Sequence, residues 1–411
     1  MKIAEKIRNI PKNIRVLLLG WFVWSPIQAM SGPYIQLYVS SLGADPSGLS
    51  IVSSMSTIAN SLSRLIGGYI ADKMGRKKIL WIGTLIISTT YVLMALAPDW
   101  RIYAIASTIQ GLSLFYQPAL EGIQADSIPL AIRGRIYALL RIVPGIMSSF
   151  SPLGGAIIVN SYGLVTGVRI IYLLAFAAGL FVTFIRYFWI EETLYIKKVD
   201  QSFLKMYWEA IQVLKKTALG LVFVDILLNL IGAIGFLGNY YMYYVLGVDE
   251  TSLALLATIS SIVNLMMMFP AGYIVDKFGR GVSIITGFLL GTLGLLIFVV
   301  TPPKSVSTLP LLIASTVISS VGGPLYGIAY SSLRADLVPQ EHRGRVYALW
   351  GIPPTFAWSI GAFIGSWIYS SMSPWLSFAT SLILRLLLTP LLIILFFYIT
   401  RSIDIELKMK K

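Results

Sequence analysis

Five ionisable side chains stand inside long apolar stretches of this 411-residue chain, and they are the first candidates for chemistry. They are Arg64, Glu121, Arg141, Asp225 and Arg385. A charge in an apolar environment is costly and is usually kept for a function. Glu121 is the best candidate, because it lies in the most polar of these stretches and because desolvation makes a carboxylate easier to protonate near neutral pH. We expect Glu121 to exchange a proton, with Asp225 as its counterpart later in the chain.

Static ion pairing is the alternative role for these groups. Arg141 follows Glu121 in the sequence and could pair with it, which would hold the carboxylate in its ionised form. Arg385 interrupts an otherwise apolar stretch and needs a buried acceptor, for which Asp225 is one possibility. In this interpretation both pairs are structural.

The elements that must position these groups are membrane-spanning helices. Hydrophobic residues make up 56% of the chain and charged residues only 12%, and the mean hydropathy is +0.79. This is too little charge for the surface of a soluble domain, and crossing the hydrocarbon takes about 20 apolar residues. We expect an all-α integral membrane protein with twelve spans, at 14–40, 46–71, 79–97, 101–127, 136–160, 166–190, 217–246, 250–275, 282–300, 308–334, 345–370 and 374–400.

The placement of charge predicts how the chain lies in the bilayer. The formal net charge of +14 could suggest nucleic-acid binding, but the lysines and arginines gather at both ends of the chain and in every second loop. The intervening loops carry only Arg101, Arg169 and Lys304. Because basic loops stay on the cytoplasmic side, we expect a multi-pass plasma-membrane protein with both termini in the cytoplasm and no nucleic-acid partner. We also expect a monomer without cofactor or metal; the chain has no cysteine.

Two motifs occur twice, in the same order and at equivalent places. The first is Gly68-Tyr-Ile-Ala-Asp72-Lys-Met-Gly75-Arg76, which returns as Gly272-Tyr-Ile-Val-Asp276-Lys-Phe-Gly279-Arg280 with seven identical positions. The second, Ala-Asp126-Ser-Ile-Pro-Leu-Ala-Ile-Arg133-Gly-Arg, returns as Ala-Asp336-Leu-Val-Pro-Gln-Glu-His-Arg343-Gly-Arg. The chain is therefore predicted to be a duplication of one half.

The first motif resembles the loop between helices 2 and 3 of major facilitator superfamily transporters, whose pattern is G-x-x-x-D-R/K-x-G-R/K. The resemblance implies two pseudo-symmetric six-helix bundles, here 1–190 and 217–411, with a cytoplasmic linker at 191–216. Within the linker, Phe203, Tyr207, Ile211 and Leu214 recur at helical spacing, which predicts an interfacial helix.

The resemblance also implies a cytoplasmic gate built on the repeated motifs. Glycines there would let backbones approach closely or turn sharply, and the charges would pair across the two halves and separate at modest cost. The alternative is that these residues only fix topology and helix ends. The predicted gate residues are Gly68, Asp72, Gly75, Arg76, Asp126, Arg133, Gly272, Asp276, Gly279, Arg280, Asp336 and Arg343.

In the family, spans 1, 4, 7 and 10 line a central cavity, and here each of these spans carries polar or small residues at helical spacing. By contrast, spans 3, 9 and 12 are nearly all apolar, as lipid-facing helices should be. Aromatic residues among the expected lining suit a bulky, flat or cationic ligand and equally a sugar. The predicted cavity residues are Glu121, Gln117, Gln28, Trp21, Arg141, Asp225, Asn229, Tyr326, Tyr330 and Arg385.

Span 5 gives a partial indication of direction. The stretch Ser151-Pro152-Leu-Gly154-Gly155 resembles the G-P-x-x-G-G motif of drug–proton antiporters, with serine in place of the first glycine and one spacer residue missing. We expect a secondary active transporter that works by alternating access and exports small amphipathic or cationic compounds in exchange for protons. The alternatives are uptake or facilitated transport of a sugar, organic acid or amino acid, and a membrane ligand sensor without flux. The absence of HExxH and cysteine argues against an enzyme.

Overall fold

The computed structural model describes residues 10–129, 132–194, 203–339 and 343–409. These residues form helices joined by short turns and contain no β-strand. The side chain of Asp72 lies outside the described part of the chain, although its backbone belongs to a helix.

The first half of the chain comprises the elements from α2 to α10. They are α2 (Lys12–Ser31), η1 (Gly32–Tyr34), α3 (Ile35–Ser41), α4 (Pro46–Met74), α5 (Arg76–Ala95), α6 (Trp100–Ser113), η2 (Leu114–Tyr116), α7 (Gln117–Ser127), α8 (Arg133–Ser149), α9 (Ser151–Tyr162) and α10 (Leu164–Trp189).

The linker helix α11 (Phe203–Thr217) leads into the second half. The second half comprises α12 (Leu219–Ile234), α13 (Gly238–Tyr244), α14 (Glu250–Phe278), α15 (Arg280–Val300), α16 (Thr308–Leu337), α17 (Arg343–Ser371) and α18 (Pro374–Met409).

All twelve predicted ranges are helical, and the predicted ends differ from the observed ones by at most three residues, except that the last helix continues to Met409. Nine helical stretches in the described part of the chain are long and apolar enough to cross a membrane. The other three ranges, occupied by α4, by α6 to α7 and by α17, are also helical but more polar. The prediction of an all-helical membrane protein is confirmed, and the count of twelve spans stays a prediction.

Several spans are interrupted where proline follows a turn. Pro33, Pro118 and Pro152 each stand at the first positions of the helical segment that follows a break. Proline cannot donate a backbone hydrogen bond and clashes with the preceding turn, but it is tolerated at the start of a helix. Spans 1 and 4 are therefore each built from two α-helices joined by a 3₁₀ turn, and span 5 from two α-helices.

The duplication is visible in local structure at the start of the second span of each half. Asp45 accepts a hydrogen bond from the backbone N–H of Gly48 at 2.7 Å, and Asp249 accepts one from Ser252 at 3.0 Å. Each aspartate caps the first turn of its helix, α4 or α14, and satisfies a free backbone donor. The two caps are offset by 204 residues, from Asp45 to Asp249.

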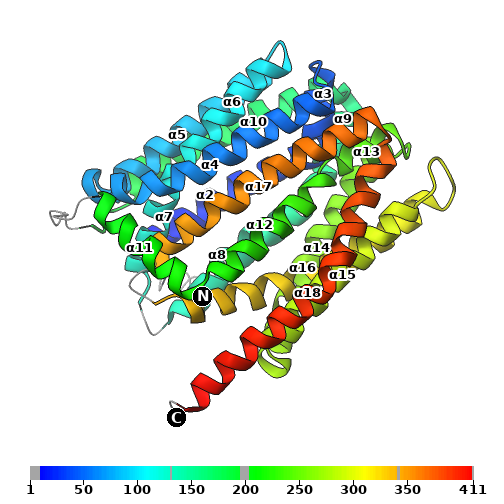
Figure 1. Ribbon diagram of the computed structural model, residues 1–411. Coiled ribbons are helices and arrows are strands. Elements are labelled where there is room, and N and C mark those ends of the chain that lie inside the picture. Colours follow the sequence, from blue (N-terminus) through cyan, green and yellow to red (C-terminus); the bar gives the residue numbers. More distant parts are fainter. Residues whose placement is uncertain (1–9, 130–131, 195–202, 340–342, 410–411) are drawn as a thin grey trace, which may run out of the picture.

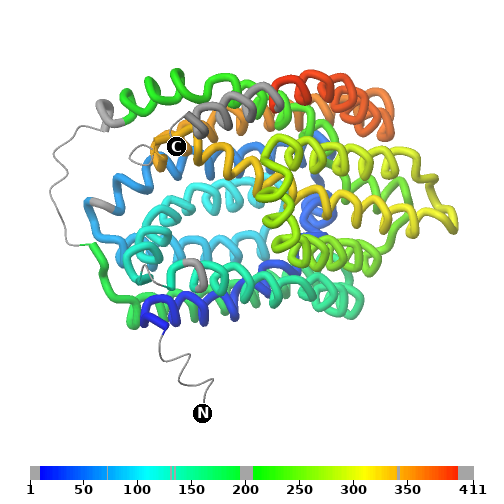
Figure 2. The backbone as a smooth tube through the Cα atoms, turned by 90° about the horizontal axis from the view of Figure 1, so that it is seen from below, coloured from blue at the N-terminus to red at the C-terminus, as the bar shows by residue number. Residues whose placement is uncertain are grey.

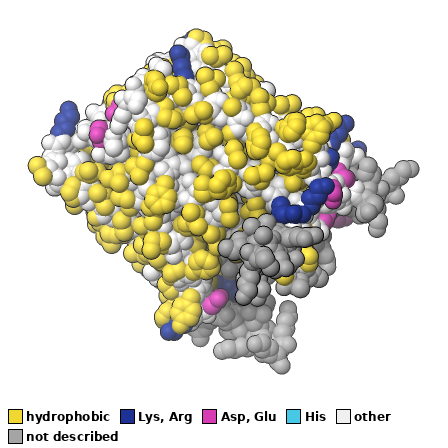
Figure 3. Space-filling model, turned by 180° about the vertical axis from the view of Figure 1, so that it is seen from behind, with side chains coloured by type: hydrophobic (Ala, Val, Ile, Leu, Met, Phe, Trp, Pro, Cys, Tyr) yellow, Lys and Arg dark blue, Asp and Glu magenta, His cyan; other side chains and the backbone are white. Residues whose placement is uncertain are grey.

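The helices run side by side along one axis, as Figures 1 and 2 show. The start of α2, the end of α18 and the linker helix α11 lie at one end of the molecule, which we call the terminus-bearing face (Figure 1). The segments α3, α9 and α13 lie at the other end, called the opposite face. Hydrophobic side chains cover most of the surface seen in Figure 3, and charges lie mainly at its margins, as expected of a surface in contact with lipid.

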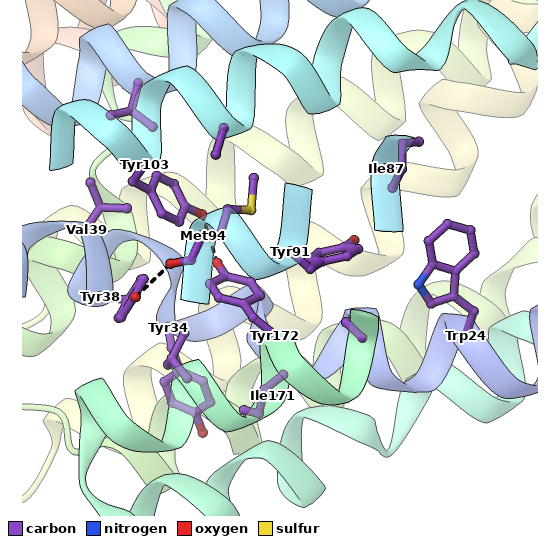
Figure 4. Packing of buried hydrophobic residues seen from close by; sticks show 14 of the residues in the cluster. Trp24, Tyr34, Tyr38, Val39, Ile87, Tyr91, Met94, Tyr103, Ile171 and Tyr172 are labelled. Atoms are coloured by element: carbon purple, nitrogen blue, oxygen red, sulfur yellow. Dashed lines mark hydrogen bonds between the residues drawn. The ribbon is translucent and has the colours of Figure 1, made fainter. Parts of the chain in front are cut away.

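The buried core is continuous between the halves only toward the opposite face. It includes Leu37 of α3 in the first half and Tyr241 and Phe378 in the second. A cluster of buried tyrosines in the first half belongs to this core: Tyr38 donates to the Met94 carbonyl at 2.9 Å, and the hydroxyls of Tyr103 and Tyr172 lie 2.8 Å apart (Figure 4). A second core is made by the second half and α11 alone.

Candidate functional site

Glycine makes the turn between the second and third spans of both halves. Gly75 and Gly279 have φ angles of +90° and +87° with extended ψ, a conformation that is nearly exclusive to glycine. A single glycine therefore separates α4 from α5, and another separates α14 from α15. The predicted sharp turn is present in each copy.

The charged residues of the two motifs form ion pairs inside each half. Arg76 pairs with Asp126, and Arg280 pairs with Asp336. Each pair joins the start of the third span to the end of the fourth. In this conformation the charges therefore pair within each half, and their pairing across the two halves when the gate closes stays a prediction.

Arg133 and Arg343 bond to backbone rather than to a carboxylate. Arg133 Nη2 donates to the Ala125 carbonyl at 3.1 Å, and Arg343 Nη2 donates to the Ala335 carbonyl at 2.5 Å. These carbonyls belong to the last turn of the fourth and tenth spans, where backbone acceptors are free and cations are favourable. The same arginine therefore closes the same helix end twice.

The predicted gate residues Asp276, Gly68 and Gly272 make fewer contacts. Asp276 is exposed and forms no ion pair among the described residues. A Cβ added to Gly68 would meet Pro118 only at 3.9 Å, and one added to Gly272 would meet nothing within 4 Å. The predicted close approach at these glycines is wrong. It occurs at Gly67, where a Cβ would lie 2.1 Å from the Phe115 carbonyl oxygen. The adjacent glycines were a visible signal, but spacing could not tell which one faces α6 to α7.

Side-chain hydrogen bonds between the halves gather at the opposite face. The described residues form five of them, and all join η1, α3 or α9 to the region from α12 to α14. Gln36 makes two, donating to the Phe236 carbonyl at 2.7 Å and accepting from the Tyr240 N–H at 3.0 Å. Asn160 donates to Thr251 at 2.9 Å. The halves are thus bonded together at this face, where the buried core is also shared.

A cavity of about 780 Å³ lies between the halves, midway along the helices. It is lined by α8 of the first half and by α14 and α16 of the second. Its polar residues include Arg141, Ser261 and Asn264, and several serines of α8 and α16 complete it. We call it the inter-half cavity. The sequence predicted Arg141 here, but not the serines of span 5 or the polar residues of span 8.

A second cavity of about 440 Å³ lies among α12, α15, α16, α17 and α18. We call it the second-half cavity. It is bordered by half of the predicted cavity residues, which converge from three helices, and it shares Gly323 with the inter-half cavity. These predicted residues are Asp225, Asn229, Tyr326, Tyr330 and Arg385.

Asp225 is held by an indole rather than by an arginine. Trp350 Nε1 donates to Asp225 Oδ2 at 2.6 Å, and both side chains are buried. Arg334 lies over the ring of Trp350, at 4.5 Å from its centre. Trp350 escaped the sequence reasoning because a tryptophan in an apolar span is usually interpreted as packing. Its position directly after the Arg343 motif was the available signal.

The static pairs that were the alternative role for these residues are both absent from the described structure. Asp225 and Arg385 border one cavity but form no ion pair, and Glu121 and Arg141 form none either. Glu121 is exposed on α7, and Arg141 is exposed on α8. Helical spacing put these residues on suitable faces, but it could not fix the separation between the helices.

The remaining predicted cavity residues border neither of the two cavities. Gln28 donates to the hydroxyl of Tyr91 at 2.7 Å, and Trp21 packs against the first-half core. Gln117 is half-buried near the break between α6 and α7. In this conformation these residues belong to the first-half wall rather than to a cavity shown here.

The comparisons with known proteins agree with the architecture. The family profile of the Major Facilitator Superfamily matches residues 17–245 and again 219–408. The chain belongs to this superfamily of membrane transporters, and it is not an enzyme. Proteins of this superfamily carry small-molecule substrates across membranes.

Among curated proteins, one relative is the Na(+), Li(+), K(+)/H(+) antiporter of Planococcus maritimus, 29% identical over 131 residues, which cover 30% of this chain and 30% of that protein. The quinolone resistance protein NorA of Staphylococcus aureus is 26% identical over 98 residues, covering 24% and 25%. These matches therefore span less than a third of either relative.

Among solved structures, the D-xylose-proton symporter has a TM-score of 0.70 at 16% identity, covering 92% of this chain and 96% of that one. The nucleoside transporter NupG has a TM-score of 0.68 at 14% identity, covering 94% and 98%. At such low identity these likenesses show the fold alone.

Proposed function

We propose that this transporter exports small amphipathic or cationic compounds from the cell in exchange for protons, by alternating access. Residues 1–190 and 217–411 would be the two moving halves, and 191–216 the tether. The protein would act as a monomer in the plasma membrane with both termini in the cytoplasm, as its loop charges predict. Partial similarity to a cation/proton antiporter and to a quinolone resistance protein supports the direction.

The observation that carries alternating access is the one-sided closure of the molecule. The halves share a core and five hydrogen bonds at the opposite face, and a cavity lined by both halves lies at mid-depth. A cavity between two rigid halves that are joined at one face is what rocking of the halves produces. If the terminus-bearing face is cytoplasmic, this conformation is the one that would load an exported compound.

Proton coupling would use a carboxylate whose surroundings change as the halves rock. Glu121 is exposed in this conformation and has no ion partner among the described residues. Closure of the terminus-bearing face would desolvate it and raise its affinity for a proton. Asp225 is the second candidate, but its carboxylate is already hydrogen-bonded to Trp350 at 2.6 Å.

We propose that the gate acts through the two loops as rigid units. The Arg76–Asp126 and Arg280–Asp336 pairs would hold each loop against its own fourth helix, so that Asp72 and Asp276 reach the other half when the terminus-bearing face closes. Arg133 and Arg343 would fix the ends of the same helices. The cost of separating the loops stays small, because exposed ion pairs contribute about 0–1 kcal/mol.

The test is transport into inside-out vesicles with an acidic lumen and a fluorescent lipophilic cation outside. We expect accumulation in the wild type, its loss on adding a protonophore, and its loss in Glu121→Gln. Glu209→Gln, which removes a carboxylate from α11 outside both cavities, is the matched control and should transport normally.

If accumulation persists in Glu121→Gln, the proposal of export remains, but Asp225 becomes the candidate for the proton-coupling site. No accumulation in the wild type would contradict the export of cations. Uptake assays with sugars and organic acids would then be the next measurement.

A further inference from the structure

Arg385 places a positive charge in the wall of the second-half cavity. It stands in the middle of α18, a helix that is otherwise almost entirely apolar over its spanning part. A Cβ added to Gly232 of α12 would lie 3.6 Å from Arg385 Nη2, and one added to Gly291 of α15 would lie 3.9 Å from Nη1. The guanidinium therefore sits between two helices that carry glycine at the point of contact, and any larger residue would narrow its access to the cavity.

This guanidinium has no counter-charge within the described residues. Their ion pairs are Lys12–Glu191, Arg76–Asp126 and Arg280–Asp336, and no hydrogen bond is formed by the Arg385 side chain. The carboxylate that borders the same cavity, Asp225, is bonded to Trp350 instead. An arginine has five donors and cannot lose its charge in a protein. A desolvated cation without a partner is unfavourable, so the site is electrostatically incomplete.

The other walls of the cavity indicate what kind of ligand would fit beside Arg385. Phe288, Tyr326 and Trp358 offer aromatic surface from α15, α16 and α17, while Asn229 adds one amide. A volume of about 440 Å³ falls within the range of cavities that hold small organic molecules. Two charged residues border the cavity, and only Arg385 lacks a partner within the described part of the chain, because Asp225 accepts the hydrogen bond from Trp350. Aromatic walls beside one unpaired cation favour a flat or apolar ligand that carries a negative charge.

The second-half cavity adjoins the space between the halves. Gly323 of α16 borders both the second-half cavity and the inter-half cavity. The two cavities are therefore neighbours at this point of α16.

We propose that the second-half cavity binds an amphipathic organic anion, whose carboxylate or comparable acidic group pairs with Arg385 while its apolar body lies against the aromatic walls. This inference rests on the transport function proposed above and adds to its substrates amphipathic compounds that carry an anionic group. A purely cationic compound would meet the unpaired guanidinium and be disfavoured at this site.

The test measures binding and requires no transport. Purified protein in lipid nanodiscs would be titrated with radiolabelled 2-naphthoate, 2-naphthamide and 2-naphthylmethylammonium by equilibrium dialysis, with empty nanodiscs as the blank. These three probes have similar shapes and differ in charge. A charge-assisted hydrogen bond predicts that 2-naphthoate binds about ten-fold or more tightly than the amide.

The variants assign that preference to one residue. Arg385→Gln should abolish the preference for 2-naphthoate, whereas Arg385→Lys should keep part of it, because lysine retains the charge but not the two-pronged geometry. Arg15→Gln removes an exposed cation at the start of α2, far from the cavity in sequence, and should leave binding unchanged. Size-exclusion profiles and melting temperatures would establish that each variant is folded.

Three outcomes overturn the proposal: equal binding of the three probes by the wild type, no binding of 2-naphthoate, or a preference that survives in folded Arg385→Gln. If Arg385→Gln does not fold, Arg385→Lys decides, since its affinity for 2-naphthoate must fall while its affinity for the amide stays the same. The assay uses no proton gradient. The anion site can therefore be confirmed when proton-coupled export is contradicted, and proton-coupled export can be confirmed when the anion site is contradicted.

Discussion

The two halves of this transporter are nearly the same in their loops and quite different in their interiors. Both halves use a glycine of positive φ in the turn after the second span, an arginine–aspartate pair, and an arginine that closes the end of the fourth helix. These contacts depend on local geometry at helix ends. Duplicated sequence therefore gives duplicated structure there.

The interiors have no such correspondence. At the offset of 204 residues that relates Asp45 to Asp249, the position of Asp225 is occupied in the first half by Trp21. At the offset of 210 residues that relates Asp126 to Asp336, the position of Trp350 is occupied by Leu140. The carboxylate–indole pair therefore has no counterpart in the first half.

Each half carries an arginine within a membrane span, but in different settings. Arg186 of α10 is 1% exposed, donates to Thr84 at 2.5 Å and lies over the ring of Tyr116. Arg385 of α18 borders a cavity instead. The comparison teaches that the loops contain the contacts common to both halves, whereas the interiors contain the groups that are specific to one half.

The largest effect is expected where one half needs glycine and the other does not. Gly67 corresponds to Ala271 at the offset of 204 residues, and Ala271 is fully buried. In Gly67→Ala the added carbon would lie 2.1 Å from the Phe115 carbonyl, so the helices must separate. Overpacking of this kind costs about 1–3 kcal/mol, which should lower the melting temperature in detergent.

Gly68→Ala is the matched control, because its nearest neighbour would be at 3.9 Å and its melting temperature should stay near that of the wild type. Equal stability of Gly67→Ala and Gly68→Ala would contradict the tight contact between α4 and the break that follows α6.

A second effect tests the carboxylate–indole pair of the second half. Trp350→Phe keeps most of the apolar ring but leaves the buried Asp225 without its donor at 2.6 Å. An unsatisfied buried acceptor costs about 1–3 kcal/mol. Thermal unfolding of Trp350→Phe, Asp225→Asn and the double variant should show strong coupling between the two residues. Additive losses would mean that the bond contributes nothing to stability.

The smallest effect concerns the linker that joins the halves. The Tyr207 hydroxyl donates to the Leu65 carbonyl of α4 at 2.8 Å, while the buried Ala210 of the same helix belongs to the second-half core. The linker helix thus contacts both halves in this conformation. Tyr207→Phe should destabilise this conformation by about 0.5–1.5 kcal/mol. The population should therefore shift toward other conformations by about two- to ten-fold.

Spin labels at Tyr162→Cys and Val306→Cys would measure that shift. Both positions are exposed at the opposite face, and the chain has no native cysteine. The distance distribution should gain a longer component in Tyr207→Phe. An unchanged distribution would show that the linker only connects the halves.

Much of the fold could be predicted because it depends on properties of single segments. Apolar length located the helices, glycine located the turns after the second and eighth spans, and two repeated motifs indicated the duplication. The sequence could not decide which residues are partners. It left open whether Arg385 pairs with Asp225 and Arg141 with Glu121, since a helical stripe shows which face a residue occupies but not what stands across from it.

The sequence by itself determined the class of protein, the helical segments and the glycine turns, because these follow from hydrophobicity and from local backbone geometry. Only the tertiary structure decided which charges meet: that Asp126 and Asp336 stay within their own halves, that Trp350 binds Asp225, and that Arg385 is left facing a cavity. Such contacts depend on helix separations of a few ångströms, and those are set jointly by all the side chains between two helices.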